Sequence, residues 1–533
     1  MNEVVARIAS SVVCAAFFCV MTFKTLGAMQ QGGYKNRSFL RWIKRGDNLY
    51  FNRLFVLSLC LFLSSVLTTL CFSFLGKTWA LSLSAVPFVF FLAVFIIVDF
   101  RYALKVPAKN TGRLYRLLLA YWLLTSAANI LIVEGLTLLS SIVPSPLYAL
   151  IAYTPFSFMT MALPLLLCAA NFVMRIFENA RNERFVQKAG EVLKTREIIR
   201  VGIVGSFGKT SVKNILAAIL SEKFQVVATP ASYNTPVGIA KTVFGDGFDK
   251  AEVMLAEMGA RKQGDIAELC ALVKPDYGVF TGVCEQHISS FKDLENVFAE
   301  KSEIIKSGAR VVCAGSLKER VKQQFGEMES VVFCSRKWLE DVELSATESK
   351  FKLKIGEKSI AVQTRLLGFA AVENIMLAAT LAYEMGMTAE EIERGIKKIS
   401  PVPHRLQLIE ANGVYVLDDG YNANPRGATE ALAALGRFKG RKCIVTPGIV
   451  ECGVLEEKIN GELGRKIADE QLDFVILVGD TLVGIVKKGY LDAGGNEKNL
   501  ALARSLDDAK ALLEGWVQTG DAVLFLNDLP DVY

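Results

Sequence analysis

Residues 196–224 read REIIRVGIVGSFGKTSVKNILAAILSEKF, and they decide the fold of the second half of the chain. IIRVGIV at 198–204 is a short apolar run rich in β-branched residues, which is typical of a buried strand. GSFGK at 205–209 is a tight glycine loop, and TSVKNILAAILSE at 210–222 has apolar residues at helical spacing. A strand, a glycine loop and a helix in this order form the context that a phosphate-binding loop requires.

The glycine loop carries residues that hold nucleotide phosphates in proteins. Gly205 and Gly208 let backbone N–H groups approach the phosphates, and the positive end of the helix dipole lies at the same place. Lys209 is expected to reach the β- and γ-phosphates, and Thr210 is expected to bind Mg²⁺. The strict spacing G-x-x-x-x-G-K-[ST] is not met, because Ile203 stands at its first glycine. A chance Gly-Lys-Thr at a strand–helix junction is the weaker interpretation, so we predict nucleotide binding.

The chain before about residue 176 differs from the rest in its hydropathy. Apolar residues make up 52% of the 533 positions, and the mean hydropathy of +0.34 is high for a soluble enzyme. A helix needs about twenty apolar residues to cross a bilayer. Five such segments occur, at roughly 4–23, 54–76, 79–98, 117–143 and 147–174. Glu134, Pro155 and Pro164 interrupt the last two segments and leave a sixth span open.

The loops between these segments predict the orientation of the chain. Segment 24–53 has seven basic residues against Asp47, and segment 99–116 has five against Asp99. By the positive-inside rule both loops are cytoplasmic, so the N-terminus lies outside. Five spans then place residue 176 in the cytoplasm, where ATP is. The formal charge of +6 is explained by these loops and does not indicate nucleic acid binding. We therefore predict a multi-pass protein of the plasma membrane.

Two further features of the composition bear on possible sites. Glu134 is the one ionisable side chain well inside a predicted span. It contacts a polar head group or a partner helix, or it lies near an interface or between spans, and the sequence leaves both interpretations open. The eleven cysteines include no CxxC pair, so they indicate reduced core or membrane residues rather than a metal or disulfide site.

The loop at 202–211 resembles the ATP loop of Mur ligases, which read approximately G-[IV]-T-G-[ST]-x-G-K-[ST], with Val204 in place of the usual Thr. The resemblance continues through the central and C-terminal domains of that family. It is closest to the branch that adds D-alanyl-D-alanine, because EMGA at 257–260 and DGYNANP at 419–425 are similar to motifs of that branch. The resemblance implies that ATP is held by Gly205, Ser206, Gly208, Lys209, Thr210 and Ser211.

The resemblance also implies a metal site. Glu257, at the end of an apolar strand, matches a family glutamate that binds a second Mg²⁺, and His287 matches a Mg²⁺-binding histidine. The carboxyl ends of strands are where open α/β sheets place ligands. Lys301 matches the lysine that family members carry as a carbamate, which turns a cation into an anionic oxygen ligand. Thr210 completes the implied ligand set.

Later motifs match nucleotide contacts of the family. Arg405 matches the arginine that contacts ATP phosphate from the domain junction, where a cation suits the charge that develops in phosphoryl transfer. Asn374 matches an asparagine that reads adenine, although two alanines at 370–371 stand where His-Asn is usual. The other implied nucleotide contacts are Asp419, near the ribose, Tyr421 and Asn422.

Three departures from the family concern the acceptor and the incoming amine. Asn234, in SYNTPVGIAKTV, matches the family's substrate loop, but its Asn-Thr-Pro is a variant. GDAVLFLNDLPDVY at 520–533 replaces the usual Lys-Gly-Ser after the last strand, which leaves the incoming amine open. The apolar segments stand where relatives that use soluble precursors hold the UDP group. A lipid-linked muropeptide is therefore a credible acceptor beside a UDP-linked one.

The implied architecture is an N-terminal α-helical transmembrane bundle followed by two α/β domains. We expect the bundle at 1–175, a linker helix at 176–197, a central P-loop ATPase domain at 198–404 and a Rossmann-like C-terminal domain at 405–533. The implied activity is ATP-dependent peptide ligation through an acyl phosphate, with Lys209, Lys301, His287 and Arg405 as catalytic residues. ATP and Mg²⁺ are the implied cofactors. The implied partners are a peptide-bearing cell-wall precursor, an amino acid or dipeptide, and the lipid bilayer.

Three rival functions can be weighed against this one. A Mur-like ligase for another envelope polymer, such as polyglutamate, would share the loop and the carbamate but should lack the Tyr-Asn-Ala-Asn-Pro phrase. A non-catalytic ATP-binding membrane scaffold is disfavoured by the presence of Glu257, His287 and Lys301, although the altered C-terminal tail keeps it open. A transporter ATPase would need a signature motif and a Walker-B run, which the chain does not show.

Overall fold

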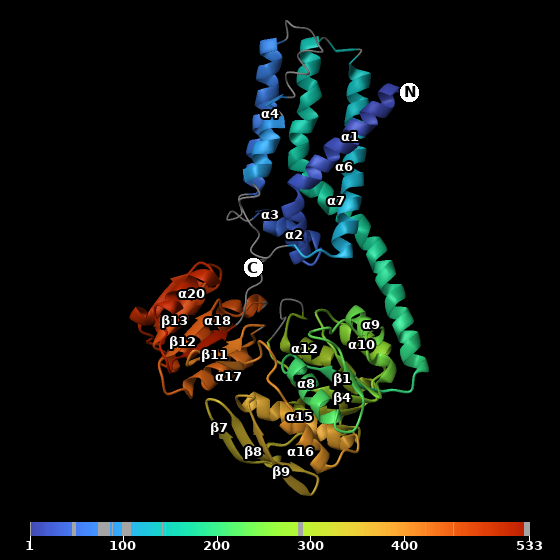
Figure 1. Ribbon diagram of the computed structural model, residues 1–533. Coiled ribbons are helices and arrows are strands. Elements are labelled where there is room, and N and C mark those ends of the chain that lie inside the picture. Colours follow the sequence, from blue (N-terminus) through green and yellow to red (C-terminus); the bar gives the residue numbers. More distant parts are fainter. Residues whose placement is uncertain are drawn as a thin grey trace. The chain divides into compact units, whose positions relative to one another are not determined.

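The computed structural model describes residues 2–44, 50–72, 86–87, 89–98, 108–140, 142–143, 145–285, 291–421, 423–450 and 452–526. The fold divides into two compact units between Arg181 and Asn182. Among the described residues, the first unit consists of helices and connections, and the second contains all three β-sheets (Figure 1).

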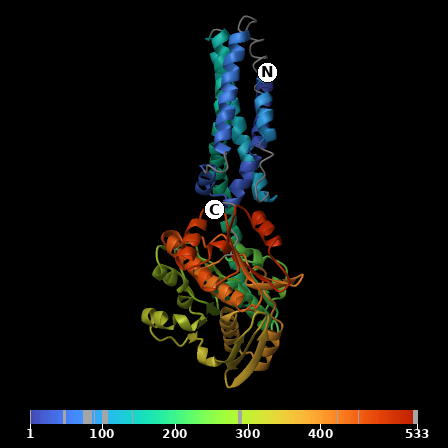
Figure 2. The same cartoon turned by 90° about the vertical axis from the view of Figure 1, so that its left-hand side faces the viewer.

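Four long helices and two short ones form most of the described part of the N-terminal unit. They are α1 (Asn2–Met21), α2 (Phe23–Gln31), α3 (Asn36–Lys44), α4 (Tyr50–Phe72), α6 (Gly112–Leu139) and α7 (Ser145–Thr195), which runs on past the end of this unit. The views in Figures 1 and 2 show α4, α6 and the first half of α7 lengthwise beside one another. The buried side chains of these helices and of α1 form one apolar core that includes Phe18, Leu61, Tyr121 and Leu167.

Two described helices are long and apolar enough to cross a membrane, namely α6 and the part of α7 at Thr154–Thr195. They contain most of the predicted segments 117–143 and 147–174. A third span results if α1 and α2, which are bent by 53°, count as one. The apolar part of α4, Asn52–Thr68, is shorter, and segment 79–98 is described only at 86–87 and 89–98. Within the described residues, helix length therefore supports two or three spans and does not support the predicted five.

α7 is a single helix of 51 residues. Pro155 and Pro164 lie inside it and do not end it. Residues 176–195, which lie within the predicted linker helix, continue the same helix, and Gly190 lies inside it without ending it.

The second unit begins with a parallel six-stranded sheet in the order β2-β3-β1-β4-β5-β6. Its strands are β1 (Ile199–Val204), β2 (Val226–Ala228), β3 (Val253–Glu257), β4 (Tyr277–Phe280), β5 (Arg310–Cys313) and β6 (Val331–Phe333). The helices that alternate with them are α8 (Lys209–Leu220), α9 (Pro236–Val243), α10 (Asp265–Val273), α12 (Leu294–Lys301), α13 (Glu303–Lys306) and α14 (Lys318–Phe325). The strands are nearly continuous apolar runs. Both faces of a parallel sheet are covered, so the side chains on both faces are buried.

The register of this sheet places the predicted site residues at one edge. Ile203 of β1 is paired with Glu257 of β3, and Val204 is paired with Phe280 of β4. The glycine loop, Glu257 and the loop after β4 therefore leave the sheet side by side at its carboxyl edge.

A small antiparallel sheet and two helices complete this domain. The sheet has the order β7 (Leu339–Leu344), β8 (Ser349–Ile355) and β9 (Lys358–Thr364). Alternate residues of β8 are buried, which is the pattern of a sheet with one face on the core. α15 (Phe369–Glu384) and α16 (Ala389–Lys397) pack against α8 in the same apolar cluster.

The last domain has a second six-stranded sheet in the order β10-β11-β15-β12-β13-β14. Its strands are β10 (Gln407–Ala411), β11 (Val414–Asp419), β12 (Lys442–Thr446), β13 (Phe474–Val478), β14 (Leu500–Ala503) and β15 (Ala522–Leu526). Only β10 is antiparallel to its neighbour. The helices are α17 (Pro425–Gly436), α18 (Glu456–Asp469), α19 (Val483–Asp492) and α20 (Leu506–Glu514). This arrangement confirms the predicted Rossmann-like domain.

Candidate active site

The glycine loop after β1 is held in a shape that only glycine allows at two positions. Gly205 has φ +155° and Gly208 has φ +74°. A Cβ atom at Gly205 would lie 1.9 Å from the hydroxyl oxygen of Thr281, and one at Gly208 would lie 2.7 Å from Oδ1 of Asn374. The N–H of Ser206 donates to the carbonyl of Gly282 at 2.8 Å, which braces the loop against the end of β4. The loop is thus fixed before any nucleotide binds.

The side chains of the loop fit an anionic ligand. Lys209 Nζ donates to the carbonyl of Gly205 at 2.7 Å and so lies across the loop. Burial lowers the pKa of Lys209, while the charge of Glu257 raises it and that of Arg405 lowers it. The hydroxyl of Ser206 is buried and has no hydrogen-bond partner in the part of the chain that the structure describes. A phosphate oxygen would satisfy both groups.

Glu257 lies at the centre of a buried polar cluster beside the loop. One of its carboxylate oxygens accepts from the hydroxyl of Thr210 at 3.0 Å and from Nζ of Lys213 at 3.1 Å. The other oxygen accepts from Nδ2 of Asn234 at 3.4 Å. The Glu257 and Lys213 side chains are each 2% exposed. The structure thus brings the predicted metal ligands Thr210 and Glu257 and the predicted substrate residue Asn234 together.

Lys213 is a member of this cluster that sequence reasoning missed. Its Nζ also donates to the carbonyl of Ala231, at 2.5 Å, and Ala231 has φ +43°. Lys213 therefore ties Glu257 to the loop that carries Asn234. The sequence signal that could have found Lys213 is its spacing from Thr210. A residue three positions after Thr210 lies on the same face of the helix and can reach the same carboxylate.

Lys301 ends α12 and is buried, at 4% exposure. Burial, and then the charge of Lys209, lower its pKa to about 7. It has no ion pair within the described ranges. The preceding residue, Glu300, accepts from the N–H groups of Gly264 and Ile266 at 2.7 Å each, which ties the end of α12 to the start of α10.

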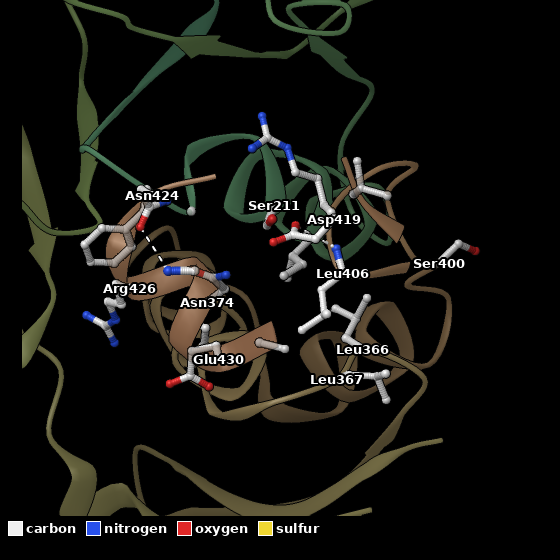
Figure 3. Close-up of a pocket in the computed structure, with 18 residues that line it drawn as sticks. Ser211, Leu366, Leu367, Asn374, Ser400, Leu406, Asp419, Asn424, Arg426 and Glu430 are labelled. Carbon is white, nitrogen blue, oxygen red and sulfur yellow. Dashed lines mark hydrogen bonds between the residues drawn. The ribbon is translucent and has the colours of Figure 1, made fainter. Parts of the chain in front are cut away.

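A cleft next to the glycine loop contains several of the predicted nucleotide contacts. It encloses about 920 Å³, including space open to solvent, and Gly208, Ser211, Asn374, Arg405 and Asp419 line it. Figure 3 shows Ser211, Asn374 and Asp419 around the same space. α8, α15 and the start of the C-terminal domain supply its walls, so the cleft lies where the two α/β domains meet.

Arg405 and Asp419 lie at this junction, and each makes a specific contact there. The Arg405 guanidinium is 4.3 Å from the centre of the Tyr421 ring. Oδ1 of Asp419 accepts from the N–H of Leu406 at 3.0 Å. Burial raises the pKa of Asp419 to about 6, although the charge of Arg405 opposes this. His404 and Leu406, on either side of Arg405, have φ +60° and +49°.

Further contacts join the two domains around the cleft, and the sequence did not predict them. Arg426 pairs with Glu373 of α15 and lies 4.5 Å from the centre of the Phe207 ring in the glycine loop. Oε2 of Glu430 accepts from the N–H of Phe369 at 3.1 Å. The sequence signal for these residues was that they adjoin predicted nucleotide contacts. Glu373 precedes Asn374, and Arg426 follows the Asn-Ala-Asn-Pro phrase.

The donor set next to the loop suits a hard divalent cation. The Glu257 carboxylate and the Thr210 hydroxyl offer oxygen ligands of the kind that Mg²⁺ prefers. No group of three His, Cys, Asp or Glu side chains suited to a metal occurs among the described residues. The predicted ligand His287 and the predicted nucleotide contact Asn422 lie outside those residues.

Comparisons with known proteins agree with this geometry. Residues 203–382 match the family described as "Mur ligase middle domain", and residues 404–527 match "Mur ligase, glutamate ligase domain". The chain is 26% identical over 341 residues to the UDP-N-acetylmuramoyl-tripeptide–D-alanyl-D-alanine ligase of Bacillus subtilis, covering 61% of this chain and 72% of that protein. It is 29% identical over 354 residues to the ligase of the same name from Mycobacterium bovis, covering 61% and 69%.

Solved structures show the same likeness. The MurF ligase of Thermotoga maritima in complex with ADP superposes with a TM-score of 0.59 at 25% identity, covering 66% of this chain and 81% of that one. MurF from Acinetobacter baumannii superposes with a TM-score of 0.60 at 21% identity, covering 66% and 78%, and shows the shared fold.

Proposed function

Since the chain belongs to the Mur ligase family of ATP-dependent peptide ligases, we propose that it is a membrane-anchored member that works in peptidoglycan precursor synthesis. In this proposal it adds D-alanyl-D-alanine, or a related amine, to a muropeptide that is UDP-linked or lipid-linked. The observation that carries the proposal is Lys301, a buried lysine without an ion pair among the described residues and with a pKa of about 7, near Lys209.

The state of Lys301 suits the carbamate that the family resemblance implies. A lysine reacts with CO₂ only as the neutral amine, and a pKa of about 7 keeps much of Lys301 neutral at cellular pH. The new N–C bond releases a proton and leaves an anionic oxygen group at the end of α12. A scaffold that merely binds ATP would have no use for such a buried amine.

ATP supplies the phosphoryl group that activates the acceptor's carboxylate as an acyl phosphate, which the incoming amine then attacks. Gly205, Gly208 and the N–H groups of the loop hold the phosphates, and Lys209 turns from the Gly205 carbonyl toward them. Arg405 supplies a cation from the other domain, where negative charge develops during the transfer.

Mg²⁺, when bound, neutralises charge on the transferring group. Thr210 and Glu257 would hold it, and carbamylated Lys301 and His287 complete the proposed ligand set. Lys213 then keeps the Glu257 carboxylate oriented, because it donates to the same oxygen as Thr210. Asn234, on the other carboxylate oxygen, is proposed to contact the acceptor.

The nucleoside is assigned to the cleft between the domains. Asn374 is proposed to read adenine, and Asp419 to accept from the ribose. Tyr421 and Asn422 complete the proposed contacts. The cleft supports this assignment because residues from both domains line it, so closure of the domains excludes water from the phosphates.

Membrane anchoring is supported by the two helices of sufficient length and apolar composition. With the catalytic domains in the cytoplasm, the N-terminal unit would keep them near acceptors at the membrane. It occupies the place in the chain where family members acting on soluble precursors hold the UDP group, which makes a lipid-linked acceptor credible.

The experiment that tests the proposal follows ADP release by the full chain in detergent. The substrates are ATP, D-alanyl-D-alanine and a tripeptide acceptor, either UDP-linked or lipid-linked. Lys209→Ala is the blank, and Lys488→Ala, an exposed lysine on α19, is the matched control that should turn over like the wild type. Release that depends on Lys209 and on an acceptor supports the ligase. No Lys209-dependent release with either acceptor would contradict the proposed reaction.

A further inference from the structure

Two arginines bind one carboxylate where the first turn of α6 meets α7. Arg116 Nε donates to Oε1 of Glu178 at 2.6 Å, and Arg181 donates to Oε2 at 2.7 Å. The Glu178 side chain is only 5% exposed, so both of its oxygens are already used. Arg113 lies on the same helix, one turn before Arg116.

Arg113 makes no ion pair in the described part of the chain. Its guanidinium lies 4.0 Å from the centre of the Tyr34 ring. Tyr34 is 8% exposed, and its hydroxyl oxygen is buried without a hydrogen-bond partner. The backbone of Tyr34 is fixed on both sides, because its N–H donates to Met29 at 2.8 Å and its carbonyl accepts from Asn171 at 3.0 Å. The hydroxyl is therefore held in place unsatisfied.

A buried hydroxyl without a partner is costly and calls for a ligand or water that completes it. Here it lies beside an excess of positive charge, since Arg113 covers the Tyr34 ring while Arg116 and Arg181 share one glutamate. A solvated basic surface would explain the arginines but not the buried phenol. The two observations together indicate an anion that accepts hydrogen bonds.

Phosphate oxygens are the acceptors that the planar guanidinium fork matches best. Basic pockets between membrane helices on the cytoplasmic side bind lipid head groups. A diphosphate carries more negative charge than the single phosphodiester of a common phospholipid, and it matches the excess of arginines better.

We propose that Arg113, Arg116 and Tyr34 bind the diphosphate of a polyprenyl-linked acceptor. This inference rests on the proposed function, and it selects the lipid-linked acceptor over the UDP-linked one. The N-terminal unit is then a substrate-binding domain as well as an anchor. Glu178 occupies Arg116 and Arg181 but not Arg113 or the Tyr34 hydroxyl, so these two groups are the main proposed contacts of the diphosphate.

The test measures binding of polyprenyl diphosphate to the full chain in phosphatidylcholine nanodiscs by native mass spectrometry. We expect Arg113→Gln to weaken this binding about tenfold. Tyr34→Phe should weaken it about threefold without lowering the melting temperature, because it removes only an unsatisfied buried hydroxyl. Arg184→Gln, an exposed arginine further along α7, is the matched control and should bind like the wild type.

Phosphatidylglycerol and inorganic pyrophosphate serve as competitors, to identify the source of the phosphate. Weak competition by both supports the inference. Equal competition by phosphatidylglycerol would assign the cluster to ordinary membrane lipid, and equal competition by pyrophosphate would remove the role of the lipid chain. Either result overturns the inference, as would equal binding by Arg113→Gln and wild type. Because binding is measured without turnover, its failure is distinguishable from failure of the ligase assay.

Discussion

The hydroxyl of Ser232 lies 2.5 Å from the hydroxyl of Tyr421, and this contact joins two loops that are 189 residues apart in the chain. Ser232 precedes Asn234 in the loop that Lys213 ties to Glu257, and Tyr421 lies under Arg405. One bond therefore connects the loop next to the Glu257 cluster with the domain that supplies Arg405. The contact is one of several that join the two domains beside the cleft.

Tyr421→Phe should raise the KM for ATP about fivefold, because it removes a hydrogen bond worth about 1 kcal/mol while keeping the ring under Arg405. Ser232→Ala removes the same bond from the other side and should have a similar effect. The double variant is the control, since it should be no worse than either single variant. Additive losses in steady-state kinetics would show that the two hydroxyls act separately.

Replacement of Lys301 should separate activity from stability. Lys301→Met is expected to abolish ADP release, since no carbamate can form, yet it should not lower the melting temperature at pH 7, because it removes a costly buried amine. The pKa of Lys301 falls from 10.5 to about 7 on folding, so the unfolded chain binds more protons between these values and stability rises with pH across that window. Lys301→Met should remove this part of the rise in melting temperature.

The same lysine predicts a response to bicarbonate. Wild-type activity should increase with added bicarbonate above pH 7, where the amine is neutral, and respond little at pH 6. Degassed buffer with and without bicarbonate provides the comparison. An activity that is indifferent to bicarbonate at every pH would contradict the carbamate.

Asp419 predicts a pH dependence of nucleotide binding. Its pKa of about 6 means that the carboxylate is protonated below that pH and no longer accepts strongly from a ribose hydroxyl. ADP affinity, measured by calorimetry, should fall as the pH is lowered from 7 to 5. Asp419→Asn should bind ADP about fivefold more weakly at pH 7, as expected for one hydrogen bond to a charged group, and should lose much of this pH dependence.

Asp419 also has a linked effect on stability. Its folded pKa lies above the usual 3.8, so the folded chain holds this proton more tightly and stability decreases as the pH rises from about 4 to about 6. Asp419→Asn should flatten that decrease in a thermal melt.

Glu300→Gln should destabilise the end of α12 by about 1–3 kcal/mol, because a buried carboxylate that accepts two N–H groups becomes an amide with one oxygen. The melting temperature and the turnover rate should both fall, since α12 positions Lys301. Glu295→Gln on the same helix is the control, and it should cost less than about 0.5 kcal/mol because its pair with Arg320 is exposed. Equal effects of the two changes would show that the hydrogen bonds from Glu300 to the start of α10 add no stability beyond that of an exposed ion pair.

The N-terminal unit illustrates a limit of reading a sequence by hydropathy. Segments 117–143 and 147–174 were recognisable because their apolar runs are long, and α6 and α7 contain most of them. The number of spans could not be predicted from hydropathy alone. An apolar run can also form a bent pair of helices, as α1 and α2 do, or a helix with a shorter apolar part, as in α4. Glu134, whose role stayed open, accepts from Arg7 at 3.1 Å, a partner 127 residues away on another helix.

The sequence by itself determined the strand–loop–helix at 198–220, the presence of two α/β domains and the residues of the glycine loop. Strand and helix periodicity and the need for glycine at positive φ are local properties, so they are visible in a linear pattern. Only the tertiary structure decided that Lys213 pairs with Glu257, that Ser232 meets Tyr421 and that Arg113 lies over an unsatisfied Tyr34. Each of these contacts joins residues far apart in the chain, and their distances and burial depend on how whole elements pack.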